Sequence, residues 1–284
     1  MNRLRSLLFV PGDRPERFAK AAASGADAII LDLEDSVVLE RKAEARRAVA
    51  DYLAGDRTVT RVVRVNPGNS REIAEDIAAI ADRRPDAVML PKAEGAASVE
   101  LVEDLFGGIA PPIIPIATET PNAIFELGSY RLVAGRLAGL TWGAEDLSAA
   151  IGASSARESD GRYTPPYQMV RSMTLFAAHA AGVAAIDTVF PAIADEDGLS
   201  AYVARARRDG FAGMMAIHPA QVAAINTGFT PTADEVTHAN AIVAAFDAHP
   251  DAGALSLDGR MIDRPHLIQA QRVLDLVQQL GPVS

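Results

Sequence analysis

The feature that most constrains the fold is a regular alternation of short apolar runs with longer amphipathic segments. Eight such runs occur, and each is followed by polar, glycine or proline residues. Most of them are apolar throughout rather than at every second residue, which is typical of parallel strands buried on both faces. The predicted strands are residues 6–10, 28–33, 61–65, 87–90, 113–117, 137–142, 184–190 and 213–217.

The segments between these runs space their apolar residues by three and four, as one buried face of a helix requires. Predicted helices cover residues 14–24, 39–53, 70–81, 96–106, 167–181 and 195–209. Eight successive strand–helix units predict an α/β fold, a (β/α)8 TIM barrel over residues 1–230, and the length of 284 residues suits one such barrel. The alternative is an open doubly wound sheet, but no Gly-x-Gly-x-x-Gly turn follows the first strand.

The chain continues past the last predicted strand for longer than a barrel needs. Two further helices are predicted over residues 234–248 and 265–280, with a turn at Asp258-Gly259 between them. We therefore expect a C-terminal helical extension over residues 231–284 that packs on the barrel or reaches a neighbouring subunit. A polar segment over residues 145–166 interrupts the regular spacing, and we interpret it as a long functional loop.

Charge and composition exclude several classes of function. The chain has 37 acidic and 27 basic residues and a formal net charge of −10, which argues against nucleic acid or an anionic membrane as the main partner. Cysteine is absent, which excludes disulfides, thiolate zinc sites and cysteine nucleophiles. No stretch is apolar enough for a membrane span or resembles a secretory signal, so we expect a cytoplasmic protein.

Charged side chains gather where the predicted strands end. In a barrel, the carboxyl ends of the strands meet at one mouth, and active sites lie there. Arg64 and Lys92 supply part of the charge that would neutralise the carboxylates at this mouth, and a divalent cation would supply the rest. The expected carboxylates are Glu34, Asp35, Glu119, Glu145 and Asp146.

The types of side chain indicate which metal such a site would hold. With no thiolate and with His218 as the only histidine at a strand end, the carboxylates suit Mg²⁺, with Mn²⁺ as the second candidate, better than zinc. Glu119 and Asp146, at adjacent strand ends, are the predicted metal ligands. The ion would bind a hydroxy or keto acid, and Arg64 would pair with its carboxylate through two hydrogen bonds. Alternatively, Glu119 favours the N-terminus of the next helix, and we interpret His218 as structural.

The strand-end residues also form a series of short motifs. They are RSLLFVPG at 5–12, LDLEDSV at 31–37, RVN at 64–66, LPK at 90–92, Glu119-Thr120, GAEDL at 143–147, IHPAQ at 217–221 and MID at 261–263. In this order they resemble the HpcH/HpaI aldolase and citrate lyase β-subunit superfamily. More narrowly, the chain resembles stand-alone citrate-lyase-β-like proteins and the malyl-CoA and citramalyl-CoA lyases.

The resemblance implies a magnesium-dependent barrel that cleaves or forms a carbon–carbon bond next to a thioester. Glu119 and Asp146 match the metal ligands of the family, and Arg64 and Glu119 match its substrate-binding positions. Asp263 matches an aspartate that enters the active site from a neighbouring subunit in related lyases. That match implies a homo-oligomer, a trimer or a multiple of it.

These inferences predict the site residues and the reaction. The candidate catalytic residues are Asp263, Arg64, Glu34 and Asp35, and the candidate coenzyme A contacts are Phe9, Pro11, Arg14 and Lys42. The expected reaction cleaves a β-hydroxyacyl-CoA to acetyl-CoA and an α-keto acid, with Asp263 protonating the enolate carbon. Four alternatives stay open: a malyl-CoA thioesterase, a citrate lyase β-subunit acting on an acyl-carrier-protein thioester, a class II aldolase acting on free keto acids, and a non-catalytic binding protein.

Overall fold

The computed structural model describes residues 4–280 of the chain. Their backbone contacts divide the chain into two compact units, with the division after Asn226. The sequence had predicted the boundary after residue 230, and the observed division lies within the helix α9 (Gln221–Phe229). Within residues 4–280, no helix is long and apolar enough to cross a membrane.

The first unit contains eight parallel strands in one sheet, in the order β5-β4-β3-β2-β1-β8-β7-β6. Two isolated parallel bridges, Ile113 with Leu137 and Ile116 with Thr141, join the remaining edges and nearly close the barrel. The predicted barrel is therefore confirmed, and the open sheet is wrong. The strands are β1 (Ser6–Pro11), β2 (Ala28–Asp32), β3 (Thr60–Arg64), β4 (Ala87–Leu90), β5 (Ile113–Pro115), β6 (Gly139–Thr141), β7 (Ala184–Asp187) and β8 (Gly213–Ala216).

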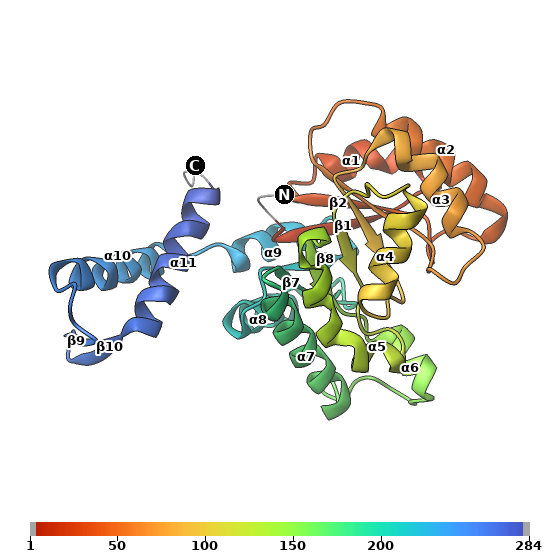
Figure 1. Ribbon diagram of the computed structural model, residues 1–284. Coiled ribbons are helices and arrows are strands. Elements are labelled where there is room, and N and C mark those ends of the chain that lie inside the picture. The colour runs from red at the N-terminus through yellow and green to blue at the C-terminus, as the bar shows by residue number, and fades with distance from the viewer. Residues whose placement is uncertain (1–3, 281–284) are drawn as a thin grey trace. The chain divides into compact units, whose positions relative to one another are not determined.

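Helices follow the strands and lie outside them (Figure 1). They are α1 (Phe18–Ala22), α2 (Lys42–Leu53), α3 (Ile73–Ile80), α4 (Ala96–Leu105), α5 (Pro121–Glu126), α6 (Glu145–Ile151), α7 (Pro165–Ala181) and α8 (Glu196–Asp209). The polar segment 145–166 is not wholly a loop, because α6 occupies its first part. Glu145 and Asp146 favour that helix start, since acidic side chains stabilise the positive end of the helix dipole.

The inside of the barrel is filled by apolar side chains from most of its strands. This cluster includes Ile30 of β2, Met89 of β4, Ile186 of β7 and Met215 of β8, all of which are buried. At Gly213 the backbone of β8 lies so close to the segment before β1 that a Cβ atom would overlap the main-chain oxygen of Leu4. This close packing lies at the amino ends of β8 and β1, opposite the carboxyl ends that the site residues follow.

The second unit is helical, as predicted, with one added feature. Helix α10 (Ala233–Ala248) begins with a capping box between Thr232 and Glu235, and α11 (Arg264–Leu280) follows it. Between them lies an antiparallel hairpin, β9 (Ala254–Leu257) and β10 (Arg260–Asp263), whose turn is the predicted Asp258-Gly259 pair. The unit has its own small core, formed by Ala239, Ile242, Phe246, Ile262, Leu267 and Ala270.

Candidate active site

A cavity of about 850 Å³ opens at the carboxyl ends of the barrel strands. Pro11 of β1, Asp32 of β2, Arg64 of β3 and Thr188 after β7 all line it. This volume is in the range of cavities that hold small-molecule ligands. Four of the five expected carboxylates also line the cavity, namely Asp35, Glu119, Glu145 and Asp146.

Arg64 lines the cavity, but two carboxylates already hold its guanidinium. Its Nε and Nη2 atoms donate to Asp32 at 2.6 and 2.7 Å, and Nη1 lies 2.9 Å from Glu34 Oε2. Burial disfavours both charges, but the paired hydrogen bonds outweigh it, so the pKa of Asp32 is lowered and that of Arg64 is raised. The Nε–Nη2 edge is therefore used by Asp32, and a substrate carboxylate has only the Nη1–Nη2 end to approach.

Glu119 is buried beside Gly143, and both residues line the cavity. Its Oε2 accepts a hydrogen bond from the main-chain nitrogen of Lys92 at 2.6 Å. Burial raises the pKa of Glu119 to about 8, and the negative charge of Asp146 adds to the effect. A Cβ atom on Gly143 would lie 2.9 Å from Glu119 Cγ and Oε1. The absence of a side chain at residue 143 therefore leaves the space that the Glu119 carboxylate occupies.

Lys92 connects the carboxylates of the site. Its ammonium lies 2.7 Å from Glu34 Oε1 and 3.1 Å from Asp146 Oδ1, while its main chain binds Glu119. The residue has φ of 51°, a left-handed conformation that costs a non-glycine residue about 1–2 kcal/mol. From the sequence, Lys92 was expected to supply part of the neutralising charge, and its bridging role was not predicted. Pro91 precedes Lys92 in the sequence, but this proline does not reveal the bridging role. The role is visible only once the fold places the neighbouring strand ends side by side.

Glu34 faces the two cations rather than the open cavity. Its Oε1 binds Lys92, and its buried Oε2 accepts no hydrogen bond within the described residues although Arg64 lies near. Burial raises the pKa of Glu34, and Arg64 opposes that rise. Asp35, the next residue, is exposed and lines the cavity, so the two adjacent carboxylates lie in different surroundings.

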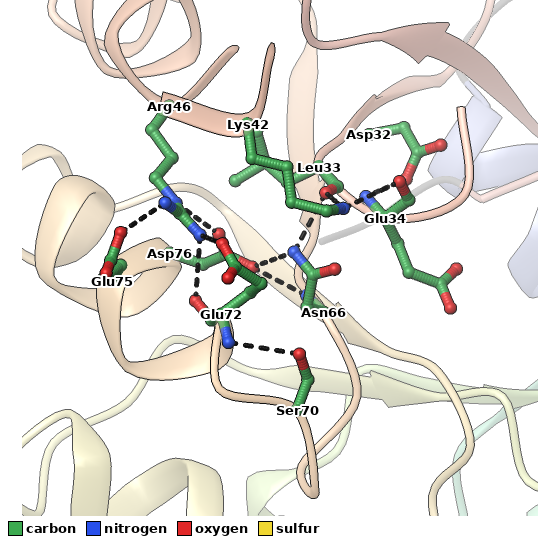
Figure 2. Close-up of polar contacts among 10 residues, drawn as sticks. All are labelled: Asp32, Leu33, Glu34, Lys42, Arg46, Asn66, Ser70, Glu72, Glu75 and Asp76. Carbon is green, nitrogen blue, oxygen red and sulfur yellow. Dashed lines mark hydrogen bonds and ion pairs between the residues drawn. The ribbon is translucent and has the colours of Figure 1, made fainter. Parts of the chain in front are cut away.

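The four candidate coenzyme A contacts separate into two pairs. Phe9 and Pro11 line the cavity, and the Phe9 ring lies 4.8 Å from the Arg64 guanidinium carbon. Arg14 and Lys42 do not line it. The Lys42 ammonium is buried and donates to the main-chain oxygens of Leu33 and Glu34 (Figure 2).

Two cations that sequence analysis did not single out line the cavity instead. Arg17 lies at the end of the short 3-10 turn after β1, and Lys20 lies on α1. Both follow the RSLLFVPG motif within a few residues. Both residues fall in a predicted amphipathic helix, and nothing in the sequence distinguished them from other surface cations of such a helix.

Asp263 ends strand β10 in the second unit. Its carboxylate Oδ1 lies 2.5 Å from Nδ1 of His266 on α11. The prediction that it reaches a neighbouring subunit stays a prediction.

The donor set fits a magnesium ion. No group of three or more histidine or acidic side chains arranged to hold a metal occurs in the described part of the chain. Magnesium needs only one or two protein carboxylates and takes its other ligands from water and substrate. Glu119 and Asp146, both in contact with Lys92, provide two such carboxylates. A cation beside Glu119 would also stabilise an anion that burial disfavours.

Comparison with known proteins identifies a family model and relatives that match most of this chain. Residues 5–219 match the model of the family described as HpcH/HpaI aldolase/citrate lyase. A citrate lyase subunit beta-like protein of Mycobacterium tuberculosis is 39% identical over 274 residues, which is 94% of this chain and 93% of the relative. A (3S)-malyl-CoA thioesterase of Cereibacter sphaeroides is 34% identical over 282 residues, 95% of this chain and 93% of the relative.

A solved structure is similar over nearly the whole length. It is protein CitE from Mycobacterium tuberculosis in complex with magnesium, acetoacetate and coenzyme A, with a TM-score of 0.84 and 37% identity. The match covers 97% of this chain and 99% of that chain.

Proposed function

Because the chain belongs to the HpcH/HpaI aldolase/citrate lyase family, a family of lyases, we propose that it is a magnesium-dependent carbon–carbon lyase. Its substrate would be a β-hydroxyacyl thioester of the malyl-CoA or citramalyl-CoA type, and its products acetyl-CoA and an α-keto acid. The observation that carries the proposal is the joining of Glu119 and Asp146 by Lys92 at the carboxyl ends of the barrel strands. The relative bound to magnesium, acetoacetate and coenzyme A supports it.

Glu119 and Asp146 would hold the magnesium ion. When bound, the ion would supply Lewis-acid stabilisation of the substrate oxygen that becomes the keto group. Lys92 would hold both carboxylates at the same time, one through its main chain and one through its ammonium. This arrangement leaves the remaining metal positions to water and substrate.

Arg64 would bind the substrate carboxylate through its Nη1–Nη2 end, because Asp32 holds the other edge of the guanidinium. Phe9 and Pro11 would contact the pantetheine arm, and Arg17 and Lys20 would meet the coenzyme A phosphates. Lys42 receives no ligand role in this proposal, since its ammonium is used by two main-chain oxygens.

The proposed cleavage is a retro-Claisen reaction. A base removes the proton of the substrate hydroxyl, and Asp35 is the candidate because it is exposed and lines the cavity. The new carbonyl forms as the carbon–carbon bond breaks, and the electron pair passes to the thioester as an enolate. Asp263 of a neighbouring subunit would then protonate the enolate carbon, which gives acetyl-CoA.

The test uses purified protein, Mg²⁺ and a panel of malyl-, citramalyl- and 3-hydroxy-3-methylglutaryl-CoA, with products read by mass spectrometry. We expect acetyl-CoA and a keto acid, and we expect Asp146→Asn to abolish both turnover and magnesium binding measured by calorimetry. An Asp263→Asn variant that kept full turnover would contradict the role of Asp263. No turnover of any thioester would reject the proposal.

The second candidate function is a malyl-CoA thioesterase, favoured by the 34% identical relative of that name. The same site would bind the thioester, but water would capture the acyl group. Free coenzyme A with a hydroxy acid in the mass spectrum would indicate this reaction in place of the cleavage.

A further inference from the structure

Behind the ends of β2 and β3 lies a second set of polar side chains that the proposed reaction does not use. It consists of Lys42 and Arg46 on α2, Asn66 after β3 and Asp76 on α3, and we call it the β2–β3 polar network. All four side chains are buried. Figure 2 shows Lys42 and Asn66 reaching the main chain of Leu33 and Glu34, with Asp76 bound to Asn66 and Arg46 bound to Asp76.

Two donors of this network meet at one carbonyl group. Lys42 Nζ lies 2.7 Å and Asn66 Nδ2 lies 2.9 Å from the main-chain oxygen of Leu33. Lys42 also donates to the oxygen of Glu34 at 3.1 Å. Leu33 follows the last residue of β2, so these bonds hold the chain where it leaves the barrel.

The rest of the network holds Asn66. Asp76 Oδ2 accepts from both the side chain and the main chain of Asn66, at 2.6 and 2.8 Å. Arg46 Nε donates to the other oxygen of Asp76 at 2.7 Å. The Asn66 amide can therefore turn only at the cost of several buried hydrogen bonds.

Lys42 is the unusual member of the network. Among residues 4–280 its ammonium forms no ion pair with a carboxylate within 4 Å, and its hydrogen bonds there are to main-chain oxygens. A buried cation without a counter-ion is costly, and a neutral side chain would fill the same space at lower cost. What the ammonium adds is a strong, directed pair of bonds to the segment that carries Glu34.

The same segment is held from its other side by the active site. Asp32 accepts from the main-chain nitrogens of Glu34 and Ser36 at 3.0 and 3.2 Å, and Asp32 is itself paired with Arg64. The Glu34 side chain then bridges to Arg64 and Lys92. A shift of this turn would thus alter the charges around both cations.

We propose that Lys42 and Asn66 are positioning residues that fix the Leu33–Glu34 main chain and so hold the Glu34 carboxylate between Arg64 and Lys92. Asp76 and Arg46 hold Asn66 in turn. None of the four side chains of the network lines the cavity, so the proposed effect on the reaction passes through Glu34. The kinetic consequence rests on the proposed lyase function, whereas the structural consequence does not.

The first test is hydrogen exchange of Lys42→Met, which keeps an unbranched side chain as far as Cε and removes the ammonium. We expect exchange of the amides in residues 33–37 to rise about tenfold or more, with the other strand ends unchanged, because outer partners of a site act locally. Unchanged exchange at residues 33–37 would overturn the proposal. A rise spread evenly over the barrel would also overturn it, because it would show a general loss of stability.

The second test is a double-mutant cycle on turnover. Lys42→Met should lower kcat about tenfold or more with little change in KM, and it should have no further effect in a Glu34→Gln background. Equal effects in both backgrounds would refute action through Glu34. Arg83→Met is the control, because Arg83 is an exposed cation in the 3-10 turn after α3 and does not line the cavity.

The two experiments separate the possible failures. If the wild type converts none of the thioesters, the proposed lyase function fails, and the exchange measurement still decides whether Lys42 positions residues 33–37. If the wild type is active and exchange is unchanged in Lys42→Met, only the positioning role fails.

Discussion

Replacing Gly143 by alanine should weaken magnesium binding without unfolding the protein. The added Cβ atom would lie 2.9 Å from Glu119 Cγ and Oε1, whereas ordinary contact begins at 3.4 Å. Glu119 would have to move by about half an ångström to relieve the overlap. Its freedom to move is small, because the side chain is buried and Lys92 holds Oε2 at 2.6 Å.

A displacement of this size is large compared with what magnesium tolerates. Magnesium requires oxygen ligands at about 2.0–2.1 Å in nearly octahedral geometry, so half an ångström removes most of one bond. We expect the dissociation constant to rise about tenfold or more, which corresponds to about 1.4 kcal/mol of binding free energy. The backbone itself accepts alanine, since Gly143 is not among the glycines with positive φ.

The assay is calorimetric titration of chelator-treated protein with MgCl2, together with thermal unfolding with and without the ion. Gly128→Ala is the matched control, because its added Cβ would meet no heavy atom within 4 Å beyond its chain neighbours and its own helix backbone, and its φ is not positive. If Gly143→Ala binds magnesium as tightly as the wild type while keeping its fold, the ion does not depend on Glu119 in the position described. The assignment of Glu119 as a ligand would then be refuted.

Three further predictions follow from the charged groups. The pKa of Asp32 is lowered in the fold, so its ion pair with Arg64 stabilises the protein above its unfolded pKa and is lost as the pH falls. Urea unfolding between about pH 6 and pH 3 should therefore show a steeper loss of stability for the wild type than for Asp32→Asn. Asp187→Asn should cost about 3 kcal/mol in the same assay, because the buried Arg171 would lose the carboxylate at its Nε and Nη2 atoms and keep only Asp209 at Nη1. Finally, a chelator should abolish turnover reversibly, and Mg²⁺ or Mn²⁺ should restore it in a coupled assay of keto-acid release.

The sequence determined the architecture of this protein to a large extent. All eight strands fall within two residues of their predicted starts, because continuous apolar runs have few other ways to bury both faces. Most of the helices were also predicted, since their apolar spacing is independent of their neighbours. Helix α6 was not predicted because it is short. The acidic residues of its first turn, Glu145 and Asp146, were interpreted only as residues of the site and not as a helix start. The strand-end carboxylates were likewise predictable, because chain order in a barrel places all strand ends at one mouth.

Only the tertiary structure decided which charged side chains pair with one another. Lysine is ordinarily a surface residue, yet Lys42 is buried beneath the segment that follows β2. Arg17 and Lys20 line the cavity in its place. Arg64 is bound along one edge by Asp32, and Lys92 connects side chains that lie far apart in the chain. The spacing of apolar residues predicts which face of a helix or strand is buried. It does not predict which partner a polar group on that face will bind, because the partner depends on side-chain direction and on desolvation by neighbouring elements. Both are properties of the packed barrel and of no single segment.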